Sequence, residues 1–257
     1  MDWGTLAAAT LRLYRQAARE TWQKVRRVWW VGLLPLLYAL LFFLAALLVA
    51  PLGIIGGFIL GLVLALCTSS YLYFLASVVS SNRVHPRELL ESWRPYLGSV
   101  ITIMFFLFIV RQVLSLLIPP VPSGQALFTL INLVLLIILN PIPEIIYQGR
   151  SEGLAMLQES VEFLRESGVE WFLPLVALAA FSFVFFPLPI FVMPLQIGNL
   201  SFPALGIGGT FWASPASLIW AVVSAFLLFV LMVFRGLLFR ALASGTRRQR
   251  VFRSRFS

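Results

Sequence analysis

The sequence predicts an all-α integral membrane protein with six transmembrane helices arranged as three hairpins, each preceded by a cytoplasmic amphipathic helix. Of the 257 residues, 60% are hydrophobic and 11% are charged, and the mean hydropathy is +0.95. This composition is far from that of soluble globular proteins. Apolar runs of about 20 residues, the length needed to cross a bilayer core, recur along the chain. The whole chain, 1–257, is expected to form a single membrane domain.

Residues 3–29 are expected to form an amphipathic helix in the plane of the membrane interface. Apolar side chains recur with a period near 3.6, at Trp3, Ala7, Leu11, Tyr14, Ala18, Trp22, Val25 and Trp29. Arg12, Arg15, Arg19 and Arg26 gather on one flank, where they could reach anionic head groups. An Arg-rich amphipathic start also fits an organellar transit peptide, which is the alternative.

Six apolar segments are expected to cross the membrane: 30–50, 52–80, 99–118, 124–140, 171–190 and 214–241. Pro51 separates the first two, and a proline cluster at 119–122 separates the third from the fourth. A short amphipathic helix is expected within 84–97, and an acidic cytoplasmic helix over 151–170. The uncharged, Gly- and Pro-rich stretch 187–213 is expected to dip into the outer interface or to re-enter the membrane.

The distribution of charge predicts the topology. Residues 1–29 hold six basic and two acidic side chains, 81–98 hold three and two, 141–170 hold two and six, and 235–257 hold seven and none. The alternate connections carry no charge. By the positive-inside rule, both termini, both charged loops and the basic tail 242–257 face the cytoplasm, which suggests a bacterial inner membrane.

A stripe of small residues marks the second predicted span. Every fourth residue is small along one helical face, at Gly53, Gly57, Gly61, Ala65 and Ser69. Such a stripe allows close helix packing. We expect it to pack inside the bundle, against the first span or a span of another hairpin; a subunit interface is the alternative.

One polar cluster is a candidate site for an anionic group such as a lipid phosphate. Arg111 is the one charge that this topology places inside the membrane, and it lies beside Gln112. On the next span, Gln125, Thr129 and Asn132 lie at compatible depths. Alternatively, Arg111 snorkels to the head groups without a specific role.

Glu159, Glu162 and Glu166 gather on one face of the predicted acidic helix and are candidates for a partner contact. They could dock on the basic elements 12–27 and 247–255 of the same chain, or receive a basic partner protein. A solvated surface is the other interpretation. The arginines of the tail are better explained by contact with anionic lipid and by fixing the orientation of the chain in the membrane than by binding to nucleic acid. No nucleic-acid partner is therefore expected.

The sequence lacks the motifs of an enzyme. His85 is the only histidine, the predicted spans hold no Asp or Glu, and no Walker or nucleophile-elbow motif occurs. Cys67, the one cysteine, lies in an apolar segment and is expected to be inert. We therefore expect no catalytic residue, no metal site and no cofactor.

The order of elements suggests a threefold unit, in which an amphipathic helix (3–29, 84–97 or 151–170) leads into a hairpin. Val28–Leu36 and Val169–Leu175 are alike, although Leu-rich segments also match by chance. This layout resembles the membrane domain of bacterial glycerophosphodiester phosphodiesterases and related polytopic proteins. The phosphodiesterase domain itself is absent from the sequence, so the resemblance implies no catalytic residue.

Two functions fit these observations. The first is a non-enzymatic structural or accessory subunit of an inner-membrane complex, which binds membrane lipids and a protein partner in the membrane or at its cytoplasmic face. The second is the permease subunit of an ABC-2-type exporter, which the predicted topology also resembles and which would pair with a separate ATPase. The low polarity of the predicted spans favours the subunit.

Overall fold

The structure is a computed structural model that describes residues 3–81, 84–118, 122–149, 151–185 and 215–244. The described residues are helical and contain no strand, as the sequence predicts for the fold class. The elements are α1 (Trp3–Arg27), η1 (Trp29–Leu33), α2 (Leu34–Val49), η2 (Ala50–Leu52), α3 (Ile54–Ser80), η3 (Pro86–Leu90), α4 (Leu97–Leu117), α5 (Pro122–Leu139), α6 (Ile142–Gln148), α7 (Ala155–Phe185) and α10 (Pro215–Ala243).

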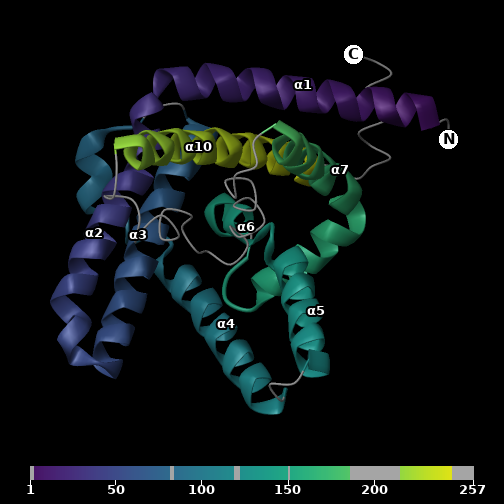
Figure 1. The fold of residues 1–257 in the computed structure, drawn as a ribbon. Helices are drawn as coiled ribbons and strands as arrows, with labels where there is room; N and C mark the ends of the chain where they lie inside the picture. The colour runs from purple at the N-terminus through teal and green to yellow at the C-terminus, as the bar shows by residue number, and fades with distance from the viewer. Residues whose placement is uncertain (1–2, 82–83, 119–121, 150, 186–214, 245–257) are drawn as a thin grey trace.

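The helices form two groups that differ in direction (Figure 1). α1 and α10 lie side by side across the upper ends of α2 and α3, and α4 and α5 lie lower in the view. The two upper helices are antiparallel, because Gly32, just after α1, faces Phe226 and Phe229, whereas Lys24 lies close to Arg240. The short α6 lies below α10, and α7 curves along one side.

Five helical segments among the described residues are long and apolar enough to cross a membrane: Trp29–Leu52, Ile54–Ser80, Leu97–Leu117, Gly124–Gln148 and Ala221–Ala243. These segments suit a multi-pass membrane protein. They match five of the six predicted spans, and the last of them, within α10, lies alongside α1 (Figure 1). The fifth predicted span, 171–190, lies partly outside the described residues, so six spans arranged as three hairpins stay a prediction.

The turn between α2 and α3 forms where the sequence predicts it. Pro51 lies in η2, and Gly53 adopts a φ of +57°, a backbone conformation that favours glycine. Gly56 then passes so close to α2 that a Cβ atom there would lie 2.4 Å from the Val49 carbonyl oxygen. Close packing against the first apolar segment is therefore made by Gly56, which lies outside the predicted stripe.

α7 joins two elements that the sequence separates. The predicted acidic helix, 151–170, and the start of the predicted fifth span, 171–190, form one continuous helix with Pro174 inside it. The predicted cap, 187–213, and most of the basic tail, 242–257, lie outside the described residues.

The loop before α4 folds back onto α3. The short helix expected within 84–97 is a 3₁₀ turn, η3, and the chain after it is anchored by serines of α3. Ser69 Oγ donates to the Trp93 carbonyl oxygen at 2.5 Å, and Ser70 Oγ lies 2.5 Å from Ser92 Oγ and 2.6 Å from Tyr38 Oη. The second half of α3 is thus covered by protein.

The core lies where the second half of α3, α6 and α10 meet beneath η1. Its fully buried side chains include Phe74, Leu75, Ile142, Ile145, Phe229 and Phe239. In contrast, α2, the first half of α3 and most of α4 and α5 expose large apolar side chains, among them Leu48, Ile54, Phe58, Phe105 and Leu116. Exposed apolar surface of this extent suits contact with lipid.

Candidate functional site: the buried Glu144–Arg235 centre

α6 carries an acidic residue into the core. Prolines at 141 and 143 stand at its start, and Gly149, with a φ of +67°, ends it after two turns. Its six residues from Ile142 to Tyr147 are all buried, and Glu144 has no exposed surface. An acidic side chain in this setting requires a charged or hydrogen-bonding partner.

Arg235 of α10 is that partner. Its Nε donates to Glu144 Oε1 at 2.8 Å, and its Nη2 donates to Glu144 Oε2 at 2.9 Å. Nη2 also donates to the Asn140 carbonyl oxygen at 2.6 Å. Arg235 is 1% exposed and Glu144 0%. The pair is bidentate, the arrangement in which arginine and a carboxylate bind most strongly.

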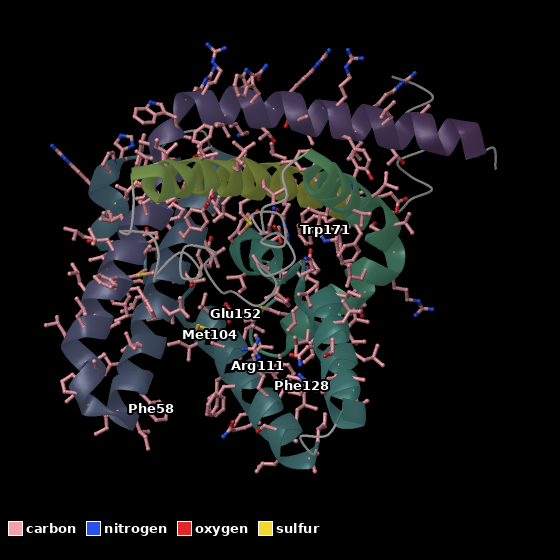
Figure 2. All side chains as sticks on the ribbon, in the orientation of Figure 1. Phe58, Met104, Arg111, Phe128, Glu152 and Trp171 are labelled. Carbon is pink, nitrogen blue, oxygen red and sulfur yellow. The ribbon has the colours of Figure 1, made fainter. Side chains whose placement is uncertain are left out.

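Trp171 of α7 completes the centre. The guanidinium carbon of Arg235 lies 4.9 Å from the centre of the Trp171 ring, so the cation stacks on the aromatic face. Trp171 Nε1 donates to Asn140 Oδ1 at 2.8 Å. Phe163 and Phe239 each pack edge-on against the same ring, and their own rings are tilted to one another. In Figure 2, Trp171 lies on the inner side of α7, towards α6 and α10.

Next to the ion pair, α6 and α10 touch without room for another atom. A Cβ atom at Gly236 would lie 2.2 Å from Tyr147 Oη, and Gln148 Nε2 donates to the Gly236 carbonyl oxygen at 3.0 Å. Tyr147 Oη and Asn140 Nδ2 are buried and have no hydrogen-bond partner among the described residues.

The geometry of this centre suits a structural connection. Both carboxylate oxygens of Glu144 are engaged, and the guanidinium is enclosed between Glu144, the Asn140 carbonyl and the Trp171 ring. The centre thereby connects four elements: the turn that follows α5, and the helices α6, α7 and α10. The last of these is far from the other three in the sequence. Within the described part of the chain, no group of three metal-ligating side chains lies together.

Two more cations stabilise the end of α3. Lys24 Nζ donates to the carbonyl oxygens of Val78 and Val79 at 3.0 and 3.3 Å, and Arg240 Nη1 donates to that of Val79 at 3.2 Å. These carbonyls belong to the last turn of α3, where the negative end of the helix dipole favours cations. Burial, and then the nearby Arg240, lowers the pKa of Lys24. α1 and α10 are therefore both fastened to α3.

In the described structure, no hydrogen bond joins the residues of the predicted anion site on α4 to those on α5. Arg111 and Gln112 are exposed on α4, and Gln125 and Thr129 are exposed on α5. Thr129 donates to the carbonyl of Gln125 and Asn132 to that of Phe128, so both bonds stay within α5. Figure 2 labels Arg111 on the lower part of α4. The predicted site stays a prediction.

The predicted packing stripe divides into two halves. Ala65 and Ser69 are buried, but a Cβ atom at Gly53, Gly57 or Gly61 would meet nothing within 4 Å. The glycine half of the stripe thus faces open space in this chain, and its contact with the first span or another hairpin is not present in the described residues. The alternative, a subunit interface, stays a prediction.

Glu162 and Glu166 are exposed on α7, and Glu159, which is half-buried, accepts a hydrogen bond from Ser151 Oγ at 2.5 Å. Among the described residues, the only salt bridge is that of Glu144 with Arg235. The acidic face is therefore not paired with the basic residues 12–27 of the same chain.

The two faces of α1 differ from the sequence prediction. Its buried face contains Ala17, Thr21, Val25 and, just after the helix, Val28, and it packs on α10. Trp22, which is 59% exposed, shares the outer face with Arg15, Arg19 and Arg26. The buried side of α1 is thus occupied by protein, and the interfacial position of residues 3–29 stays a prediction.

The sequence analysis missed the buried centre. It placed Glu144 in the charged loop 141–170, and it counted Arg235 with the basic residues 235–257. Both residues lie within apolar helical segments, so Arg111 is not the one charge inside such a segment. The available signal was the position of each charge in an apolar run, Glu144 in Ile142–Tyr147 and Arg235 after the run Ala225–Phe234.

No protein-family model, curated protein or solved structure matches the chain.

Proposed function

We propose that this protein is a non-enzymatic, multi-pass subunit of a bacterial inner-membrane complex, which binds membrane lipid and presents charged helix faces to a protein partner. The observation that carries the proposal is the contrast between inner and outer charges. The buried charges of the centre, Glu144 and Arg235, form an ion pair with each other, whereas arginines on α1 and glutamates on α7 are exposed to solvent.

The apolar surface of α2, α3, α4 and α5 supports membrane insertion. The two charged faces lie on α1 and α7, which are outside this apolar group (Figure 1), and their arginines and Glu162 and Glu166 are exposed. Exposed arginine and tryptophan side chains are the residue types that contribute most to protein interfaces. Together these features favour a scaffold with a binding surface over a solute pathway.

The experiment is co-purification of the full chain in mild detergent, followed by mass spectrometry of proteins and lipids together. We expect a reproducible protein partner and bound phospholipid from the wild type. Reversing the charge of the exposed arginines, R15E/R19E, should remove the protein partner, whereas R87E/R94E in the loop before α4 makes the same change of charge elsewhere and should retain it.

Recovery of the chain alone, with the same lipid as bulk membrane, would contradict the proposal. Recovery of an ATPase in fixed ratio would instead favour the permease subunit of an ABC-2-type exporter, which is the alternative function.

A further inference from the structure

The outer face of α1 and the acidic face of α7 have matching charge patterns. Arg12, Arg15 and Arg19 follow the spacing i, i+3, i+7, and all three are exposed. Glu159, Glu162 and Glu166 follow the same spacing on α7. In a helix this spacing aligns side chains on one face.

The two faces are neighbours in one chain but do not pair. Tyr14, which lies between Arg12 and Arg15 in the sequence but is half-buried, donates its hydroxyl hydrogen to the Glu170 carbonyl oxygen of α7 at 2.6 Å. Glu166 is one turn before this contact. Both charged faces therefore border the same corner of the molecule, yet no ion pair joins them among the described residues.

An aromatic side chain lies inside the basic face. Trp22 is 59% exposed, and a shallow depression is lined by Arg15, Ala18, Arg19, Trp22 and Gln23. A depression that combines arginine with tryptophan suits a helix that brings both carboxylates and apolar atoms. The acidic face of α7 offers both, because Val169, which is 70% exposed, lies one turn from Glu166.

We propose that the chain self-associates, with the basic face of α1 in one copy docked on the acidic face of α7 in a second copy. Since both faces border one corner, a two-fold axis there lets each copy supply one basic and one acidic face, which closes the assembly as a dimer. This proposal rests on the proposed function, because it names the partner of the charged faces as a second copy of this chain.

The test uses the full chain in nanodiscs or mild detergent with zwitterionic lipid only, and measures mass by light scattering and association by energy transfer between labelled copies. We expect a dimer whose dissociation constant rises with salt, because exposed ion pairs are screened. R15E/R19E and E162R/E166R should each weaken association at least tenfold.

The decisive experiment mixes the two charge-reversed variants, R15E/R19E and E162R/E166R. A copy with R15E/R19E presents acidic α1 and acidic α7, and a copy with E162R/E166R presents two basic faces, so the mixed pair regains attraction at both contacts. Energy transfer between the two variants should exceed that of either variant with itself. The matched controls R87E/R94E and E91R/E152R, which change exposed charges elsewhere, should associate like the wild type.

A monomeric wild type overturns the proposal, and so does a dimer that is insensitive to both reversals. If the wild type is monomeric but R15E/R19E loses a co-purifying protein, the second copy is the wrong partner and the proposed function stands. If R15E/R19E loses only its binding to vesicles containing anionic phospholipid, the basic face of α1 binds lipid, and the proposal that the chain self-associates is wrong.

Discussion

Glu144 and Arg235, 91 positions apart in the chain, form a bidentate ion pair in which neither side chain is accessible to solvent. Such a pair contributes little net stability compared with apolar residues of the same size, because both charges must be desolvated. Removing one partner is costly, because the other charge is then left buried and uncompensated.

Replacing Glu144 by Gln should therefore lower the free energy of unfolding by about 3–5 kcal/mol. Unfolding by urea in mild detergent measures the change, with E152Q at an exposed position as control. The double variant E144L/R235M should be more stable than E144Q. An E144Q variant as stable as E152Q would show that the pair does not hold α6 against α10.

A methyl group at Gly236 should lower the free energy of unfolding by about 1–3 kcal/mol, because its Cβ would collide with Tyr147 Oη. G236A/Y147F removes that oxygen and should recover part of the loss. Gly57→Ala, where nothing lies within 4 Å, is the matched control and should be near neutral. Thermal unfolding of the three variants in one detergent compares them directly.

Gly57→Leu separates packing inside the chain from a subunit interface. Since Gly57 faces open space, the larger side chain should leave the fold intact. Loss of assembly without loss of thermal stability would support the interface, and unchanged assembly would argue against it.

The contact between α1 and α7 should weaken at high pH. Burial, and then the negative charge of Glu170, raises the pKa of Tyr14 from 10.0 to about 12. Since the folded state favours neutral Tyr14, its contribution is complete below pH 10 and is lost as the pH rises from about 10 to about 12. Y14F lacks the hydrogen bond and should be less stable by about 1 kcal/mol at pH 8.

The comparison of wild type with Y14F isolates this group from the other tyrosines. The stability difference between them should shrink as the pH rises from 9 to 11. A difference that stays constant over that range would mean that the Tyr14 hydroxyl is not coupled to folding.

Ser70→Ala should release the loop before α4 from α3, because Ser70 joins Tyr38 to Ser92. Hydrogen exchange in Pro86–Leu90 and the residues after it should become faster by about five- to tenfold, as expected for the loss of roughly 1 kcal/mol. Ser80→Ala, whose hydroxyl donates only to Ala76 of its own helix, is the control.

Arg111→Leu tests the predicted anion site. If the site binds a lipid phosphate, the variant should retain less co-purified anionic phospholipid than the wild type, measured by lipid mass spectrometry. Arg87→Leu, an exposed arginine outside the apolar helices, is the control. If the wild type and both variants retain equal amounts of anionic phospholipid, Arg111 does not bind a specific lipid and only snorkels to the head groups.

The sequence was sufficient to predict the fold class and most apolar helices because runs of about 20 apolar residues have few alternatives to membrane helices. It was not sufficient to predict α6. Prolines at 141 and 143 are typical of a loop, yet they also suit the first turn of a helix, and Glu144 is hidden only because Arg235 approaches from a distant segment. Each charge stands in an apolar run, but the sequence alone does not show which residue pairs with it.

The faces of α1 could not be predicted from periodicity alone. Trp22 and Val25 fit the same apolar period, but Val25 is 1% exposed and Trp22 is 59% exposed. The choice between them depends on which side of α1 packs on α10, and that contact joins segments far apart in the sequence. Tryptophan on the outer face can also be accommodated because its indole nitrogen remains accessible to water.

The covering of α3 by the loop before α4 has a consequence for the surrounding bilayer. Because Ser69 and Ser70 are bonded to that loop, the part of the α2–α3 hairpin left for lipid is α2 and the first half of α3. The apolar segment that contains α2, Trp29–Leu52, has 24 residues and extends about 36 Å at 1.5 Å per residue. A hydrocarbon core is about 30 Å thick, so this segment is long enough to cross it with some tilt, and lipid beside the hairpin meets α3 only along its first half.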